Sequence, residues 1–195
     1  MNKNLKKYLK FLYLVCLLFF IFIVFLSFVY KKQKNYKISK NDSLVVEFEN
    51  SNEFYIKNLL PVSDNLGRNF DNSDSEVGIK GYTQFSIVNT VDYDIKYEIF
   101  LSKKETKKKQ IKDNYIKVYL TDSSNNPLSG FENNRVPSYN ELDYIADKPS
   151  SKLVYKGKID KHSTKKFIMR SWLSDSYAID KNEEEFIFFV NVRTK

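Results

Sequence analysis

An unbroken apolar run of 20 residues, at 11–30, constrains this chain most. It contains no charged residue, and Ser27 is its one aliphatic hydroxyl. At about 1.5 Å per residue, a helix of that length crosses a hydrocarbon core of about 30 Å. A buried core helix would have a polar face, and this stretch has none. The run therefore predicts a membrane helix with a domain on one side of the bilayer.

Two features favour an uncleaved signal anchor. A cleaved signal peptide has a shorter apolar region and small residues before its cleavage site, whereas bulky residues end this run. Lipidation of Cys16 would need a small residue before it, and Val15 stands there. Lysines flank the run on both sides, so charge alone does not set its orientation. The leader of ten residues favours an N-terminus inside and a domain outside.

The anchor divides the chain into four predicted parts. They are a cytoplasmic leader at 1–10, the transmembrane signal anchor at 11–30, a basic stalk at 31–42 and an extracytoplasmic domain at 43–195. A domain of about 150 residues is large enough for its own hydrophobic core. The chain's one cysteine lies in the anchor, so the domain has no disulfide. An exported domain without cysteine fits a bacterial surface better than a secretory pathway.

The net charge of +8 belongs to the membrane flanks. Residues 1–42 carry nine lysines against Asp42, whereas residues 43–195 carry 23 basic and 23 acidic residues. Lysines beside a membrane helix meet anionic headgroups. The domain has zero net charge and no overall attraction for polyanions, so we expect no nucleic-acid partner.

The domain alternates apolar and polar residues with the period of two that marks half-buried strands. Within 93–101, Ile95 and Tyr97 point one way and Lys96 and Glu98 the other. Eight strands are predicted, at 44–48, 54–60, 81–89, 93–101, 115–121, 152–159, 166–173 and 186–193.

The expected fold class is mainly β: an antiparallel Ig-like β-sandwich behind the N-terminal transmembrane helix. Polar turns join the predicted strands, and no long helical pattern separates them. One short helix is expected at 139–145, because Ser138 and Glu141 have the spacing of a capping box.

Residues with catalytic chemistry are scarce. His162, the only histidine, lies in a turn between two predicted strands, where a solvated turn residue is favoured over a general base. No glycine-rich phosphate loop occurs. Two of the domain's carboxylates could converge as in glycoside hydrolases, but no spacing supports a pair. We expect no catalytic residue, no cofactor and no enzymatic activity.

One acidic segment, at 71–76, could place oxygens around Ca²⁺ together with Asp64. It lacks the glycine and the spacing of an EF-hand loop. A solvated acidic loop is favoured, and we expect no metal site.

The strongest charge cluster of the domain lies between the strands predicted at 93–101 and 115–121, in what should be a hairpin loop. Its members are Lys103, Lys104, Lys107, Lys108, Lys109 and Lys112. They are candidates for contact with anionic lipid or wall-polymer phosphates, while a mobile solvated loop is the favoured alternative. No aromatic residues are interleaved, which argues against stacking on single-stranded nucleic acid.

Arg170 and Trp172 share one face of the strand predicted at 166–173. They are candidates for an exposed stack that would mark a binding surface. Packing of Trp172 in the core or between sheets is the favoured alternative.

Four segments carry a family resemblance: 60–64, 115–122, 167–177 and 186–192. In them the chain resembles uncharacterised single-pass surface proteins of low-GC Gram-positive bacteria, and it is distantly similar to TasA/camelysin-type exported sandwiches. The resemblance covers roughly residues 55–193. It implies a membrane helix followed by an extracytoplasmic β-sandwich, and it brings no catalytic residues. TasA-type proteins have a cleavable signal, whereas the apolar run of this chain is expected to remain as an uncleaved signal anchor.

These features together predict a membrane-anchored extracytoplasmic binding or structural module of the bacterial cell surface. Its expected partners are the lipid bilayer, through residues 11–30, and another envelope protein or an anionic wall polymer. Two alternatives stay open. One is a cell-envelope hydrolase that uses dispersed carboxylates, and the other is an accessory subunit of a membrane complex.

Overall fold

The computed structural model describes residues 13, 15–23, 36–37, 43–49, 51–57, 59–71, 81–178 and 184–195. The chain falls into two compact units, Met1–Asn35 and Tyr36–Lys195. The second unit contains the predicted domain.

In the first unit, residues 13 and 15–23 are helical. This helix carries exposed apolar side chains, among them Leu18, Phe19 and Phe22. Within the described part of the chain, no helix has both the length and the apolar character needed to cross a membrane. The predicted leader at 1–10 and the rest of the predicted anchor lie outside the described residues.

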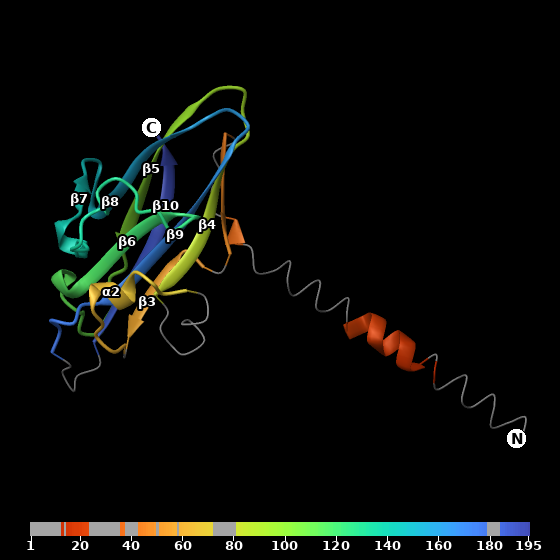
Figure 1. Cartoon of the computed structure of the whole chain (residues 1–195), viewed down its shortest axis with the longest axis horizontal. Coiled ribbons are helices and arrows are strands. Elements are labelled where there is room, and N and C mark those ends of the chain that lie inside the picture. The colour runs from red at the N-terminus through yellow and green to blue at the C-terminus, as the bar shows by residue number, and fades with distance from the viewer. Residues whose placement is uncertain are drawn as a thin grey trace, which may run out of the picture. The chain divides into compact units, whose positions relative to one another are not determined.

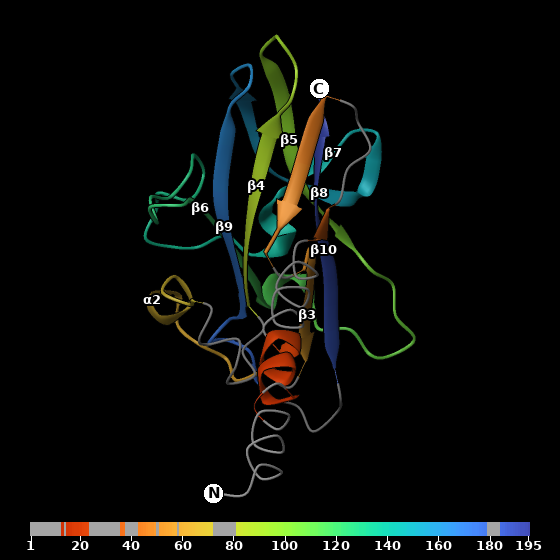
Figure 2. The same cartoon turned by 90° about the vertical axis from the view of Figure 1, so that its right-hand side faces the viewer.

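The second unit consists of two antiparallel sheets, each with five described strands. Figure 1 and Figure 2 show the two sheets as separate layers. The first sheet has the order β1 (Tyr36–Lys37), β2 (Leu44–Phe48), β4 (Tyr82–Asn89), β9 (Thr164–Leu173), β6 (Ile116–Asp122). The second has the order β3 (Glu53–Lys57), β10 (Glu185–Thr194), β5 (Ile95–Lys103), β8 (Lys148–Ile159), β7 (Asp143–Ile145).

The core lies between the sheets and is rich in aromatic rings. In β4 every second residue is buried, as a sheet with one face on the core requires. Phe85 of β4 stacks between Phe48 of β2 and Phe167 of β9, with ring centroids 5.1 and 5.4 Å apart. Ile99 of β5 and Val190 of β10, both at 0% exposure, belong to the same core cluster and come from the other sheet. The mainly β prediction is therefore confirmed.

All eight predicted segments form strands; β2 has the predicted bounds, and the other seven have shifted ends. The largest shifts are in β3, which ends at Lys57 rather than at residue 60, and in β8, which begins at Lys148 rather than at residue 152. The strands β1 and β7 were not predicted. Both are short edge strands, of two and three residues, too short to show a period of two.

The helix predicted at 139–145 is wrong in its second half. Residues Tyr139–Glu141 form the single 3₁₀ turn η2, and residues 143–145 form β7 instead. The predicted capping pair is confirmed, because the Glu141 carboxylate accepts a hydrogen bond from the Ser138 backbone N–H at 2.8 Å. The helix stops there because β8 offers the next residues backbone partners along its free edge.

The segment between β5 and β6 is not a hairpin loop. β5 lies in one sheet and β6 in the other, so residues 104–115, which include the 3₁₀ turn η1 (Asp113–Tyr115), cross between the layers. β5 cannot pair with β6 because β10 and β8 occupy both of its edges. The crossing segment runs beside the start of β10, where the Lys104 N–H donates to the Ile187 carbonyl at 2.9 Å.

Candidate functional site

The predicted lysine cluster is largely neutralised by carboxylates. Four of its six members lie within ion-pair distance of an acidic side chain. The pairs are Lys103–Asp113 at 2.6 Å, Lys104–Glu53 at 3.6 Å, Lys108–Glu185 at 3.6 Å and Lys109–Glu184 at 2.5 Å. Lys107 and Lys112 are exposed. The cluster therefore presents much less positive charge than its sequence suggests.

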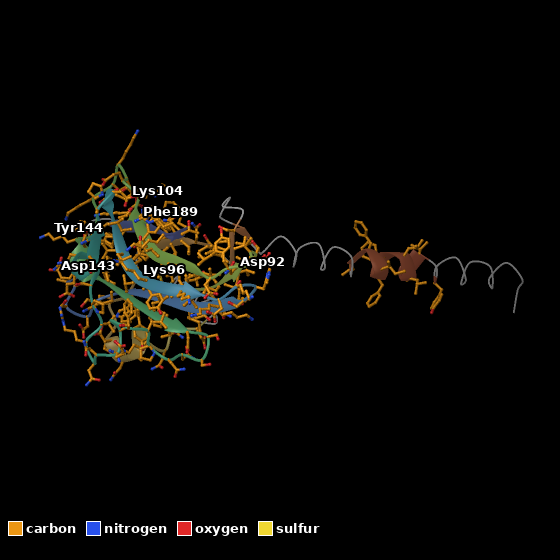
Figure 3. The ribbon with its side chains drawn as sticks, turned by 90° about the horizontal axis from the view of Figure 1, so that it is seen from above. Asp92, Lys96, Lys104, Asp143, Tyr144 and Phe189 are labelled. Carbon is orange, nitrogen blue, oxygen red and sulfur yellow. The ribbon has the colours of Figure 1, made fainter. Side chains whose placement is uncertain are left out.

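Two of these lysines also rest on aromatic rings of β10. The Lys103 ammonium lies 4.7 Å from the centroid of the Phe186 ring, and that of Lys104 lies 5.7 Å from Phe189. Figure 3 shows Lys104 next to Phe189. These contacts hold the beginning of the segment against the sheet rather than leave it free in solvent.

The prediction of an exposed stack of Arg170 and Trp172 is wrong. Arg170 is 4% exposed and Trp172 is 1% exposed. The indole packs edge-on against Phe70 and Tyr119, with ring centroids 6.3 and 6.4 Å apart, as the favoured alternative predicted. The stack fails because the helix α2 (Asp64–Gly67) lies against β9 and covers this face of the sheet.

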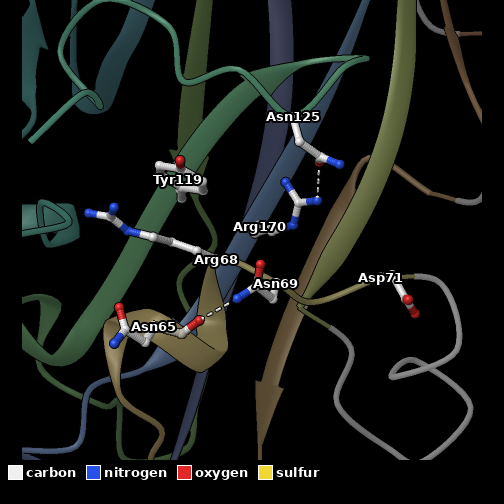
Figure 4. A pocket seen from close by; sticks show the side chains of 7 residues that line it. All are labelled: Asn65, Arg68, Asn69, Asp71, Tyr119, Asn125 and Arg170. Atoms are coloured by element: carbon white, nitrogen blue, oxygen red, sulfur yellow. Dashed lines mark hydrogen bonds between the residues drawn. The ribbon is translucent and has the colours of Figure 1, made fainter. Parts of the chain in front are cut away.

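Arg170 lines a polar pocket of about 350 Å³ that the sequence did not reveal (Figure 4). Tyr119 and Arg170 are register partners on β6 and β9, so both project from the same face of the sheet. Side chains from α2, from the residues after it and from the turn after β6 complete the lining, which consists of Asn65, Arg68, Asn69, Asp71, Tyr119, Asn125 and Arg170. The pocket thus combines two guanidinium groups, three amides, one phenol and one carboxylate.

Arg170 donates hydrogen bonds to three acceptors, all of them uncharged. Its Nε donates to the Phe70 carbonyl at 2.6 Å, and its Nη1 donates to Thr121 Oγ1 at 3.3 Å. Its Nη2 donates to Asn125 Oδ1 at 2.6 Å, the bond dashed in Figure 4. Burial lowers the pKa of Arg170. Tyr82, Tyr119 and Asp71 raise it, and the effect of Asp71 is the smallest of the three. Among the described residues, no carboxylate forms an ion pair with Arg170.

The Arg68 guanidinium packs over the Tyr119 ring, 5.2 Å from the ring centroid. Its Nη2 donates to the carbonyls of Asn133 and Asn134 at 2.5 and 2.6 Å. In Figure 4 this guanidinium points away from Arg170. The Arg68 Nε is buried and has no hydrogen-bond partner. Arg68 therefore forms one wall of the pocket.

A tight turn after β6 holds Asn125 over Arg170. Asp122 Oδ1 accepts hydrogen bonds from the backbone N–H groups of Ser124 and Asn126, at 2.8 and 2.9 Å. The side-chain hydrogen bond from Asn126 lowers the pKa of Asp122, so the carboxylate stays charged and keeps the turn closed. Asn125 has a φ of 63°, a left-handed conformation that asparagine tolerates better than most residues.

A second cavity, of about 460 Å³, lies over β3 and β10. The polar groups that line it already bind one another. Glu185 pairs with Lys108 at 3.6 Å and accepts a hydrogen bond from the Tyr55 hydroxyl at 2.9 Å. A ligand there would have to break these contacts. This cavity is the weaker candidate.

His162 lies in the exposed turn between β8 and β9, with a φ of 50°. Its Nε2 is 2.6 Å from Asp92 Oδ1, and both side chains are well exposed. A pair at the tip of a surface turn has no enclosed space for a substrate. The solvated-turn interpretation fits this position.

The described residues contain no cluster of three side chains able to hold a metal ion. Residues 72–76 of the considered calcium segment lie outside the described part of the chain. Asp64 accepts a hydrogen bond from the Val136 backbone N–H at 2.9 Å, which ties α2 to the segment before η2.

Every clear pKa shift among the described carboxyl groups is downward. Backbone hydrogen bonding from Ser138 lowers the pKa of Glu141 to about 2. Side-chain hydrogen bonds from Lys158 and Arg193 lower the pKa of Asp94 and of Asp147 respectively. These carboxyl groups are held in the charged form by partners and are not prepared to donate a proton at neutral pH.

Comparisons with known proteins identify no family. No family model matches the sequence, and no curated protein matches it. One solved structure, of a beta-glucosidase from Kluyveromyces marxianus in complex with glucose, aligns with 71% of this chain and 12% of that chain. The alignment has 10% identity and a TM-score of 0.24, too low to support a conclusion about fold or function.

Proposed function

We propose that this chain is a membrane-anchored, extracytoplasmic binding module of the bacterial cell surface, built as an Ig-like β-sandwich. The observation that carries the proposal is the polar pocket around Arg170. A concave site with a few convergent polar groups is the usual form of a ligand site. The resemblance to single-pass surface proteins of low-GC Gram-positive bacteria supports the location outside the membrane.

The lining of the pocket favours binding over hydrolysis. A hydrolase of the two-carboxylate type needs one carboxyl group with a raised pKa as the general acid and a second carboxylate beside it. The pocket offers one carboxylate, Asp71, among amides and guanidinium groups. Fixed hydrogen-bond donors of this kind hold a ligand but have no proton to transfer at neutral pH.

The tether is supported by the apolar run at 11–30 and by the exposed apolar side chains of the helical residues 15–23. Apolar side chains on all sides of a helix suit a lipid environment. The same surface could pack on other membrane helices, which is how an accessory subunit of a membrane complex would use it.

Protease treatment of intact cells tests the topology. We expect added protease to remove the domain from about residue 36 onward and to spare the anchor. A domain that is protected until the membrane is permeabilised would contradict the proposal. Crosslinking of the full chain in its own membrane then distinguishes the two roles. A binding module should lose its crosslinks in the Arg170→Gln variant, whereas an accessory subunit held through its helix should keep them.

A further inference from the structure

We propose that the Arg170 pocket binds one oxyanion group, a carboxylate or a phosphodiester, of an acidic ligand. This inference rests on the proposed role as a binding module and adds the charge of the ligand. Three observations support it: two arginines have carboxylate partners among the described residues and the two in the pocket do not, hydrogen-bond donors remain in the pocket, and the lining has a net positive charge.

The chain has four arginines, at 68, 135, 170 and 193, and carboxylates pair with two of them. Arg193 lies 2.8 Å from Glu98 and 2.6 Å from Asp147, although its side chain is 28% exposed. Arg135 pairs with Glu141 at 2.5 Å. The other two arginines have no carboxylate partner among the described residues, and both line the same pocket.

The absence of such a partner matters most for Arg170. A buried charge is costly unless an opposite charge compensates it, and Arg170 is 4% exposed. The less buried Arg193 has two carboxylates, so the domain does not generally leave arginines unpaired. A bound anion would supply the missing compensation.

Hydrogen-bond donors remain in the pocket after the internal bonds are counted. A guanidinium carries five N–H groups, and Arg170 uses three of them on Phe70, Thr121 and Asn125. One N–H on each of its two terminal nitrogens therefore remains. Because Asn125 Oδ1 accepts from Arg170, the amide NH₂ of Asn125 is left as a further donor.

The net charge of the pocket lining favours a ligand group that carries a single negative charge. Two guanidinium groups and the carboxylate of Asp71 give a net charge of +1. A carboxylate or a phosphodiester carries one negative charge at neutral pH and accepts several hydrogen bonds from a guanidinium. The lysine cluster is a poorer anion site, because four of its six charges already face carboxylates.

Calorimetric titration of the full chain in non-ionic detergent micelles tests the proposal with two probes. D-glucuronate presents a carboxylate and dimethyl phosphate presents a phosphodiester, and their neutral counterparts are D-glucose and trimethyl phosphate. We expect at least one anion to bind with one-to-one stoichiometry and neither neutral compound to bind. The anion that binds more tightly identifies the source of the charge. Trp172, the only tryptophan, packs against Tyr119 of the pocket, so its fluorescence should change on binding.

Two variants that each remove one positive charge locate the site. Arg170→Gln should weaken binding by about tenfold to a hundredfold, as expected for loss of a charge-assisted hydrogen bond. Lys107→Gln, in the exposed segment, should change it by less than about twofold. If Arg170→Gln proves unfolded by circular dichroism, Asn125→Gly replaces it, since glycine keeps the positive φ and removes the amide donor.

Three outcomes would overturn the inference: neither anion binds, both variants bind as the wild type does, or Lys107→Gln loses binding as well. Anion binding should also persist at about 0.15 M salt, because a buried site is screened less than a surface patch. A domain that crosslinks to a partner but binds neither anion would refute only this inference. A domain protected from protease in intact cells would refute the proposed function even if the anions bind.

Discussion

Gly67 lies directly against the indole of Trp172. A Cβ atom added at Gly67 would come within 2.2 Å of the Trp172 ring, closer than any side chain can approach. The contact joins the end of α2 to the outer face of β9. It therefore sets the position of Arg68 and Asn69, the two pocket residues that follow directly.

Gly67→Ala should destabilise the domain by about 1–3 kcal/mol, because the added methyl group forces α2 away from Trp172. Chemical denaturation followed by Trp172 fluorescence measures the loss. Leu66→Ala is the control: Leu66 is 62% exposed, so its truncation should cost less than about 0.5 kcal/mol. Equal effects of the two changes would show that the close contact does not determine the position of α2.

Arg193→Met should be destabilising, by about 1.5–3 kcal/mol, because the buried Glu98 carboxylate loses its hydrogen-bonded partner and keeps only the ammonium group of Lys195, 3.7 Å away. Glu98 is 4% exposed; the Arg193 Nε donates to Glu98 Oε2 at 2.9 Å, and the Arg193 Nη2 lies 2.8 Å from the same oxygen. The double variant Arg193→Met with Glu98→Gln should recover part of the loss, since it removes the buried charge that has lost this partner. A thermal melt followed by circular dichroism checks both, and no recovery would contradict the charge explanation.

Glu141→Gln should lower stability at neutral pH but not in strong acid. Backbone hydrogen bonding from Ser138 lowers the pKa of Glu141 from 4.5 to about 2 in the folded domain. A lowered folded-state pKa gives stability that is fully present above pH 4.5 and is lost as the pH falls toward 2. The difference in unfolding free energy between wild type and variant should therefore shrink over that interval. Glu105→Gln, at an exposed position, is the control and should change stability by less than about 0.5 kcal/mol.

Replacing Lys104, Lys108 and Lys109 by serine should not change binding to anionic vesicles, because carboxylates already neutralise all three. Co-sedimentation of a soluble domain, residues 36–195, with vesicles at low salt measures this. Wild-type binding that weakens as salt rises to about 0.15 M, and that the variant lacks, would contradict the prediction. It would restore the lysine cluster as a binding surface.

The sequence by itself determined eight of the ten described strands. The alternation in β4 and β5 is a local property, and a strand with a period of two buries one face wherever it pairs. The capping pair Ser138–Glu141 was predictable for the same reason, because its partners are three residues apart. Glu98 was assigned to the outer face of its strand, opposite Ile95 and Tyr97, by the same alternation, yet it is buried there, at 4% exposure.

Only the tertiary structure decided what covers those outer faces. The alternation says which way a side chain points but not which distant segment lies above it. Arg170 is buried because Phe70, 100 residues earlier, accepts its hydrogen bond, and because the turn at Asn125 closes over it. The pocket exists where α2, β6 and β9 meet, and long-range packing brings these elements together. A buried arginine without a carboxylate therefore becomes visible only in the folded domain.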